Sequence, residues 1–310
     1  VAASARSAGK TYREAVGERW AFSWEIPEKV AGMTVVDAAD IDEVSKHVDF
    51  VFCAVDMKKD EIRALEEAYA KHEIPVVSNN SACRGIEDVP MVVPEINADH
   101  LAVIEAQKKR LGTKNGFIAV KPNCSIQSYV PALTPLLDFE PEKVSVCTYQ
   151  AISGAGKTFK TWPEMVDNVI PYIGGEEEKS ENEPLKLWGH VEDGKIVNAA
   201  LPVISAQCLR VACSDGHMAA VSVSFKKKPT IEQIKERWAN YETEAQRLEL
   251  PSAPKPFLQY FEAPSRPQTR LDRDFQNGFG VSIGRLREDK LFDYRFVFEE
   301  QDRSVAGSQT

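Results

Sequence analysis

A cysteine in the segment KPNCS is the residue of this sequence whose surroundings most favour covalent chemistry. Cys124 follows an apolar strand, in the segment 117–125 that runs from a strand into a turn, and precedes SIQSYVPALTPLL, which has the character of a helix. At such a turn, backbone N–H groups and the positive end of the helix dipole lower a thiol pKa and enrich the nucleophilic thiolate. The alternative is a buried cysteine at an ordinary turn, and this segment alone does not decide between them.

Two polar residues near the mouths of later strands add candidate groups. His217 lies in CSDGHMAAVSV, where a glycine turn opens a strand, and a histidine there can exchange protons near neutral pH. Arg210 lies in the otherwise apolar segment LRVACS. Because an unpaired buried arginine is costly, this position predicts a carboxylate or phosphate partner. A surface turn histidine and a structural Arg–Glu pair are the alternatives.

A small, glycine-rich loop follows Gln150 in the segment QAISGAGK. Such a loop lets the backbone approach a flat ring or a phosphate closely. The loop lacks the GxxxxGK[ST] pattern of a P-loop, so a mononucleotide site of that kind is not expected.

Several basic and acidic residues are ambiguous when each is taken alone. Arg6 and Ser7 form a small basic loop near the start of the chain, where a parallel nucleotide-binding sheet would meet the 2′-phosphate of NADP. A solvated basic tail is the alternative. Arg84 in NNSACRG and the pair Glu183 and Lys186 in NEPLK are typical of solvated surface charges.

The elements that must position these residues fall into two patterns along the chain. In the first, the segments 47–55, 74–79 and 117–125 have the apolar, β-branched character of strands, and 58–73 and 97–110 have helical spacing. Strand–helix–strand alternation with short links predicts right-handed crossovers and a parallel sheet. We therefore expect an open α/β sheet over about the first 120 residues.

The remainder of the sequence contains strands with few helices between them. The strand-like segments are 143–153, 196–205, 209–214, 217–227, 279–288 and 291–300. One long helix is expected over 230–250, and the segments 174–184 and 253–268 are expected to be exposed loops. Strands without crossover helices predict a largely antiparallel sheet, so this part is expected to be an α+β domain.

Composition excludes several classes of protein. The 310 residues include 38 Lys and Arg against 47 Asp and Glu, a net charge of −9 that disfavours general nucleic-acid binding. No apolar run approaches the ~20 residues of a membrane span, and no signal peptide is recognisable, so we expect a soluble, cytoplasmic protein. The six cysteines show no CxxC or paired Cys/His spacing, so most are expected to be free and no metal site is predicted.

Taken in order, the segments NCS, YQAISGAGK, NEPLK and LRVACSDGH resemble the aspartate-semialdehyde dehydrogenases, NADP-dependent phosphorylating enzymes, in their fungal/archaeal-type branch. The resemblance extends from ASARSAGK to about Phe296. It implies a Rossmann-like dinucleotide-binding domain over 1–122, a catalytic and dimerisation domain with a mainly antiparallel sheet over 123–298, and an atypical C-terminal tail over 299–310.

The resemblance also implies a role for each candidate residue. Cys124 would be the nucleophile, His217 the acid/base, and Gln150 the residue that orients the acyl group. The implied binding residues are Arg210, Glu183 and Asn123 for the amino-acid end of the substrate, Arg84 and Lys186 for phosphate, and Arg6, Ser7, Ser153 and Gly154 for NADP.

The implied reaction converts aspartyl-4-phosphate to aspartate-4-semialdehyde, in the pathway to threonine, methionine and isoleucine, with NADPH as cofactor. Attack by a thiolate expels phosphate and leaves a thioester, which divides one difficult step into two. A thioester accepts hydride better than a carboxylate does, and the protein supplies position and charge. A homodimer or homotetramer is expected.

Two departures from the family pattern bear on this interpretation. The family begins with a strand and a GxTGxxG-type glycine loop and ends with an Asn-containing segment and a Gly/Ala-rich helix. This sequence begins at Val1, beyond that loop, and ends EEQDRSVAGSQT. We therefore expect a truncated or mis-spliced chain, or a degenerate paralogue, with weak NADPH binding. The alternative functions are a related acyl-phosphate or acyl-CoA reductase, of the malonyl-CoA or N-acetyl-glutamyl-phosphate type, and a catalytically silent binding protein.

Overall fold

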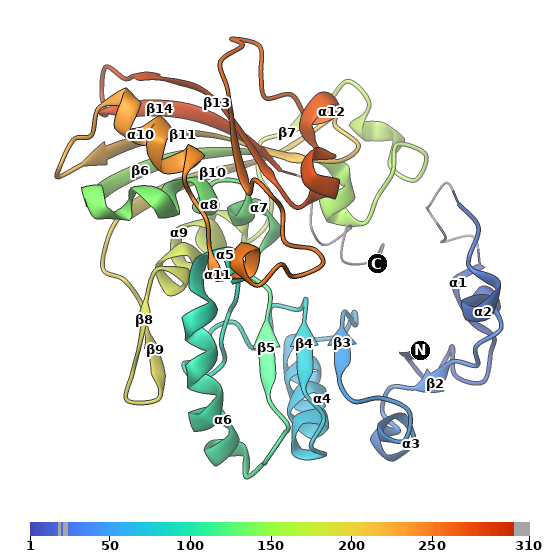
Figure 1. Ribbon diagram of the computed structural model, residues 1–310. Helices are drawn as coiled ribbons and strands as arrows, with labels where there is room; N and C mark the ends of the chain where they lie inside the picture. The colour runs from blue at the N-terminus through green and yellow to red at the C-terminus, as the bar shows by residue number, and fades with distance from the viewer. Residues whose placement is uncertain (18–19, 21–23, 301–310) are drawn as a thin grey trace. The chain divides into compact units, whose positions relative to one another are not determined.

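The chain folds into two compact units in the computed structural model, in which the described residues are 1–17, 20 and 24–300 (Figure 1). The first unit comprises Val1–Pro90 and Ala102–Lys121. The second comprises Met91–Leu101 and the chain from Pro122 on. Each unit contains its own sheet system, and we describe the two separately.

The segment 91–101 belongs to the second unit, whereas the sequence analysis placed it in the first domain. Its contacts explain the difference. The Tyr241 hydroxyl donates to the Glu95 carbonyl at 2.6 Å, and a ring nitrogen of His100 lies 3.1 Å from the Gly189 carbonyl. Such contacts between residues far apart in the sequence are not visible in local patterns. Most of the predicted tail, from residue 301, lies outside the described residues.

Parallel strands form the first unit, as the sequence predicted. Its strands are β1 (Ala2–Ala3), β2 (Val36–Asp37), β3 (Val51–Cys53), β4 (Val76–Ser78) and β5 (Ile118–Val120). β1 pairs with β2, and β3, β4 and β5 pair in that order, all in parallel. Its helices are α1 (Tyr12–Val16), α2 (Glu28–Ala31), α3 (Ile41–Ser45), α4 (Lys59–Lys71) and α6 (Ile104–Leu111). These elements confirm the expected parallel α/β arrangement.

An apolar groove separates β1 from β3 in this unit. Its lining includes Val1 and Ala2 on one side and Val51, Phe52 and Cys53 on the other. The Phe52 side chain is 78% exposed, which is unusual for a large apolar residue on a parallel strand. No strand among the described residues pairs with this edge of β3.

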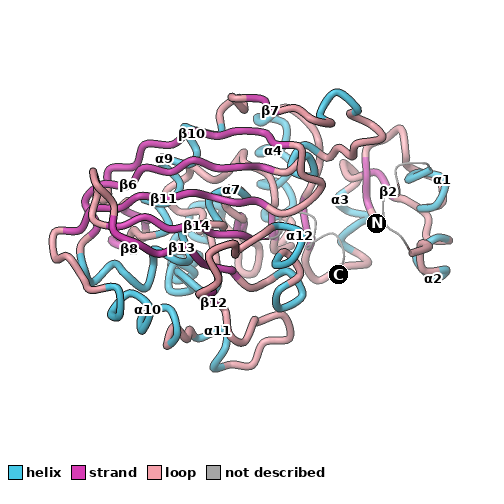
Figure 2. The backbone as a smooth tube through the Cα atoms, turned by 90° about the horizontal axis from the view of Figure 1, so that it is seen from above, coloured by secondary structure: helices cyan, strands magenta, loops and turns pink. Residues whose placement is uncertain are grey.

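A mixed sheet of seven strands forms the frame of the second unit (Figure 2). The strands, in spatial order, are β12 (Leu258–Phe261), β13 (Val281–Glu288), β14 (Tyr294–Glu300), β11 (His217–Phe225), β6 (Pro141–Gln150), β10 (Val203–Val211) and β7 (Val169–Ile170). The pairs β12–β13 and β6–β10 are parallel, and the other pairs are antiparallel. The mainly antiparallel sheet is therefore confirmed. A separate hairpin contains β8 (His190–Glu192) and β9 (Lys195–Val197).

Helices cover one face of this sheet (Figure 1). The α-helices of the second unit are α5 (Pro94–Asn97), α7 (Cys124–Gln127), α8 (Val130–Leu133), α9 (Glu176–Leu187), α10 (Ile231–Ala239), α11 (Glu244–Arg247) and α12 (Thr269–Asp272). The 3₁₀ turns are η2 (Ala98–Val103), η3 (Thr134–Phe139), η4 (Ile152–Ala155), η5 (Pro163–Met165) and η6 (Phe275–Gly278). Of these, α7, α8, α9, α10 and α12 contact strands of the sheet.

Two segments expected to be exposed loops contain regular structure. The segment 253–268 includes strand β12, and its Phe257 is 1% exposed. The segment 174–184 is mostly helix α9, the crossover that the parallel pair β6–β10 requires. Its Gly-Gly start and internal proline predicted a loop, and that prediction is wrong.

A tertiary hydrogen bond accommodates the proline inside α9. Pro184 has no N–H, so it cannot donate to the carbonyl of Ser180 one turn earlier. The buried Tyr129 hydroxyl donates to that carbonyl at 2.6 Å and replaces the missing helix bond. The helix continues to Leu187 because a residue 55 positions from Pro184 supplies the donor.

Among the described residues, none of the helices has the length and apolar character needed to cross a membrane.

Candidate active site

Cys124 is the first residue of α7, directly after the strand-to-helix turn that the sequence predicted. Asn123 caps the helix, and its side-chain oxygen accepts from the Ser125 backbone N–H at 2.8 Å. The Glu183 carboxylate accepts from the Asn123 backbone N–H at 2.6 Å, so α9 holds this turn from the other side. The position of Cys124 is thereby defined by two elements rather than by the local turn alone.

Strand register brings three of the candidate residues into one row. Arg210 on β10 is the direct partner of Gln150 on β6. The pairing of Met218 with Tyr149 places His217, one residue earlier on β11, beside Gln150. Residues opposite each other on paired strands project to the same face. The three side chains are 6%, 1% and 1% exposed respectively, so the row is buried.

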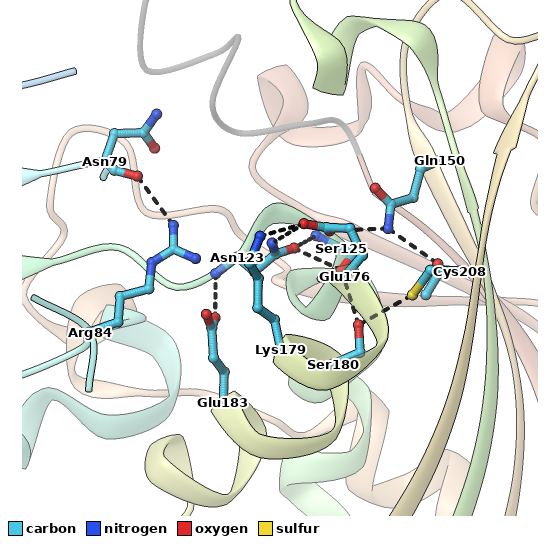
Figure 3. Close-up of polar contacts among 11 residues, drawn as sticks. Asn79, Arg84, Asn123, Ser125, Gln150, Glu176, Lys179, Ser180, Glu183 and Cys208 are labelled. Carbon is cyan, nitrogen blue, oxygen red and sulfur yellow. Dashed lines mark hydrogen bonds and ion pairs between the residues drawn. The ribbon is translucent and has the colours of Figure 1, made fainter. Parts of the chain in front are cut away.

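A buried carboxylate on α9 connects this row to the cysteine turn. Glu176 accepts from the Asn123 side-chain amide at 3.0 Å and from the Gln150 amide at 3.3 Å (Figure 3). The Lys179 ammonium lies 2.8 Å from the same carboxylate. Burial raises the pKa of Glu176, but the hydrogen bond and charge of Lys179 and the bonds from the two amides lower it more. The pKa therefore lies below its usual value, and the group stays ionised at neutral pH.

The glycine-rich loop lies against both the arginine and the histidine of the row. The Arg210 guanidinium donates to the Ala151 carbonyl at 2.6 Å, and the Ala151 N–H donates to His217 Nδ1 at 3.1 Å. A Cβ atom on Gly154 would lie 3.0 Å from the guanidinium and 3.1 Å from the imidazole ring. Because Gly154 has no Cβ, the Arg210 and His217 side chains can occupy this space. Ser153 is anchored by its backbone N–H, which donates to the Ser214 carbonyl at 3.1 Å.

The other residues predicted for the site are distributed over both units and differ in how exposed they are. Arg84 lies in the first unit, half-buried, and donates to the Asn79 carbonyl at 3.2 Å. Arg6 is exposed and Ser7 half-buried in the turn that follows β1. Lys186 is 7% exposed near the end of α9.

Glu176 and Lys179 lie beside the candidate residues, and the sequence did not predict them as part of the site. They are three residues apart and share one face of α9, the geometry in which a Glu–Lys pair forms. The Glu-x-x-Lys spacing is visible in the sequence, but it has this meaning only in a helix. Because 174–184 was expected to be a loop, the pair was overlooked.

A half-buried cysteine at a helix start, a histidine, an arginine and an ionised carboxylate in one unit, in a chain whose other unit is a parallel α/β fold, are consistent with a nicotinamide-dependent dehydrogenase of the cysteine type. Comparison with family models supports this class. Residues 1–104 match the semialdehyde dehydrogenase NAD binding domain, and residues 133–299 match the semialdehyde dehydrogenase dimerisation domain.

Comparison with individual proteins identifies the family within this class. The chain is 40% identical over 306 residues to the aspartate-semialdehyde dehydrogenase of Aspergillus fumigatus, with coverage of 96% of this chain and 83% of that protein. It is 42% identical over 302 residues to that of Schizosaccharomyces pombe, with coverage of 95% and 83%. The crystal structure of aspartate-semialdehyde dehydrogenase with NADP from Candida albicans superposes with a TM-score of 0.85 at 35% identity, over 96% of this chain and 84% of that one.

The chain therefore belongs to the aspartate-semialdehyde dehydrogenase family, a family of oxidoreductases with a nicotinamide-binding domain. The resemblance inferred from the four sequence motifs is confirmed. The alternative of a related acyl-phosphate or acyl-CoA reductase receives no support from these relatives.

Replacing Gly154 with alanine should displace Arg210 or His217 and reduce turnover. The added Cβ would approach both side chains more closely than ordinary contact distance. A displacement of about 1 Å at a reacting group lowers kcat/KM by roughly 100-fold. Steady-state kinetics of Gly154→Ala, compared with Gly174→Ala as a control, tests this, since a Cβ at Gly174 meets nothing within 4 Å. Equal activity of the two variants would contradict the packing role of Gly154.

Proposed function

We propose that this protein catalyses the NADP-dependent reductive dephosphorylation of aspartyl-4-phosphate to aspartate-4-semialdehyde through a thioester on Cys124. The observation that carries the proposal is the set of contacts from the cysteine turn through Glu176 to Gln150, and from the backbone N–H of the next residue, Ala151, to His217. These contacts link a nucleophile, an acyl-orienting amide and a proton-transfer group within one domain.

The first step is attack on the acyl phosphate. The Cys124 sulfur forms a bond to the acyl carbon, the bond from that carbon to the phosphate oxygen breaks, and inorganic phosphate leaves. Gln150 donates its amide N–H toward Glu176, and the same amide orients the acyl group beside the sulfur. The product of this step is a thioester on Cys124.

The second step reduces that thioester and releases the aldehyde. When bound, the nicotinamide cofactor supplies a hydride to the acyl carbon. His217 protonates the resulting oxygen and later removes that proton as the carbon–sulfur bond breaks. Since Nδ1 of His217 accepts from the Ala151 N–H, the neutral ring carries its proton on Nε2, which is the atom that exchanges it.

Charges in the second unit match the amino-acid end of the substrate. Arg210 presents a planar fork suited to the α-carboxylate. Glu176, which stays ionised, is suited to the α-ammonium group. Asn123 reaches the substrate from the cysteine turn, while Glu183 holds the backbone of that turn.

Basic side chains would bind the leaving phosphate. The resemblance assigns this role to Arg84 and Lys186. The Lys179 ammonium, 2.8 Å from the Glu176 carboxylate, is a further candidate cation in the second unit. Point charges and guanidinium forks both suit phosphate.

The residues that would hold NADP fit the group in two respects. Arg6 is exposed just after the carboxyl end of β1, where a parallel nucleotide-binding sheet meets the adenosine 2′-phosphate. Ser7 closes the same turn by donating its N–H to the Ser4 carbonyl at 2.8 Å. On the nicotinamide side, Ser153 and Gly154 present a turn without bulky side chains.

The face of the sheet opposite the active-site row supports a homodimer. Tyr149 alternates with Gln150 along β6, so it projects to the opposite face, where it is 37% exposed. Leu209 and Met218 are its direct partners on the neighbouring strands. These side chains would be buried by a second copy, and the dimerisation-domain match covers all three strands.

Removal of the Cys124 thiol should abolish turnover. The nucleophile cannot be replaced by a neighbouring group, so Cys124→Ser and Cys124→Ala should lose roughly 1,000-fold or more in kcat. Circular dichroism serves as the folding control, and Cys147→Ser, a half-buried cysteine on β6, serves as the matched variant. Wild-type turnover by Cys124→Ser would rule out the thioester mechanism.

Neutralising Glu176 should weaken binding of the amino-acid substrate. A lost charge-assisted hydrogen bond costs about 1.5–3 kcal/mol, so Glu176→Gln should raise the KM for aspartate semialdehyde roughly 10- to 100-fold. Glu178→Gln, at an exposed position two residues later on α9, is the control and should behave as wild type. An unchanged KM in Glu176→Gln would remove this carboxylate from the substrate site.

Arg6 should set the preference for NADPH over NADH. An exposed ion pair contributes about 1 kcal/mol, so Arg6→Ala should lower the ratio of kcat/KM values for the two cofactors by about fivefold. Lys10→Ala, also exposed in the same basic segment, should leave the ratio unchanged. An equal loss in both variants would indicate a general charge effect rather than recognition by Arg6.

A further inference from the structure

A buried carboxylate continues the active-site row beyond His217. β11 pairs with β14 in an antiparallel register that makes His217 the direct partner of Glu300. Opposite residues in such a pair project to the same face, with Cβ atoms about 4.5–5.5 Å apart. Glu300 is 2% exposed. The row therefore reads Arg210, Gln150, His217 and Glu300 across four adjacent strands.

The contact of His217 with the glycine-rich loop affects the protonation of its ring in the opposite sense to a neighbouring carboxylate. The Ala151 N–H donates to Nδ1 at 3.1 Å, and a donor at this position favours the neutral ring, because a protonated Nδ1 could not accept it. An ionised carboxylate near the ring favours its protonated form, and Glu300, the direct strand partner of His217, is the carboxylate on this side. A histidine that both gives and takes a proton needs neither form to be strongly preferred.

The other charges around this pair are distributed over several elements. Gln150 is neutral and lies between His217 and Arg210 in the row, but the Arg210 guanidinium also approaches the His217 ring, because both lie about 3 Å from the position of a Cβ on Gly154. This cation favours the neutral ring and opposes the effect of Glu300. Among the described residues, the charged or titratable groups near the row and the end of β14 include Arg210, Glu176 and Lys179 on the helix-covered face, and Glu299, Asp272, Arg273 and Asp274 toward α12.

Glu299 provides an internal comparison because it neighbours Glu300 but projects to the opposite face. It is the direct partner of Met218, and its carboxylate lies 2.7 Å from the position of a Cβ on Gly216. Burial raises the pKa of Glu299 to about 9, with a further contribution from the neighbouring acids. Its side chain is therefore uncharged at pH 7 and adds no field at the histidine.

We propose that Glu300 is a positioning residue for this reaction, which stabilises the protonated form of His217 and keeps its ring in the row. The inference rests on the proposed role of His217 as the proton-transfer group. Glu300 touches neither substrate nor cofactor in this account and acts only through the histidine.

The test is the titration of the His217 ring, followed by NMR of the histidine Cε1–H signals in the full chain. The signal is assigned by its loss in His217→Gln. Removal of an opposite charge at this separation should lower the pH midpoint of His217 by about one unit in Glu300→Gln. Glu299→Gln should leave the midpoint within about 0.2 units of wild type at pH values where Glu299 is uncharged.

The pH profile of kcat/KM gives a second readout. In Glu300→Gln, the limb of the profile that is assigned to His217 should shift in the same direction as the NMR midpoint and by the same amount. In Glu299→Gln, this limb should not shift. If Glu300→Gln does not fold, Glu300→Asp retains the charge on a shorter side chain and should give a smaller shift in the same direction. An unchanged midpoint in the folded variant, or an equal shift in Glu299→Gln, would overturn the proposal.

Failure of this inference is distinguishable from failure of the proposed function. The NMR midpoint is measured without substrate or cofactor, so it reports on the Glu300–His217 pair whether or not the protein turns over. Wild-type activity in Cys124→Ser would refute the thioester mechanism and leave the midpoint comparison intact.

Discussion

The pairing register of β10, β6, β11 and β14 is the constraint on which the active site depends. It aligns Arg210, Gln150, His217 and Glu300 side by side on one face of the sheet. Because strand side chains alternate with a period of two, a slip of one residue in any pair would move its member of the row to the opposite face. The buried apolar residues elsewhere on these strands oppose such a slip, because the slip would move them to the opposite face and expose them to solvent.

Helix α9 adds a buried ion pair next to the row. Glu176 accepts hydrogen bonds from two side-chain amides, and Lys179 compensates its buried charge. A buried carboxylate of this kind is tolerable only with several such partners. The helix reaches far enough to hold the cysteine turn through Glu183 because the Tyr129 hydroxyl satisfies the carbonyl that Pro184 leaves without a donor.

The two faces of the same strands have different surroundings. Gln150 faces the helices, whereas Tyr149, its neighbour along β6, faces away from them. In the proposed dimer, contacts made by Tyr149, Leu209 and Met218 would stiffen the strands that hold the row. Assembly would therefore support the geometry of the site without any partner residue entering it.

By itself, the sequence determined the order of elements in the nucleotide-binding part, the family, and the turn at Cys124. These features rest on local patterns: apolar periodicity, turn residues and motif order, which act over a few positions. It misassigned the segment 174–184, because glycine and proline are usually helix breakers and the compensating donor, Tyr129, lies far away in the chain.

Only the tertiary structure decided which side chains share the site. Glu176 and Lys179 became site residues once their segment was seen to be a helix, and Glu300 joined His217 through strand pairing. Gly154 was expected to line the nicotinamide, but its packing against Arg210 and His217 depends on a loop folding back onto two strands. Register and long-range packing arise from the sum of many contacts between distant residues, and no short segment of the sequence encodes them.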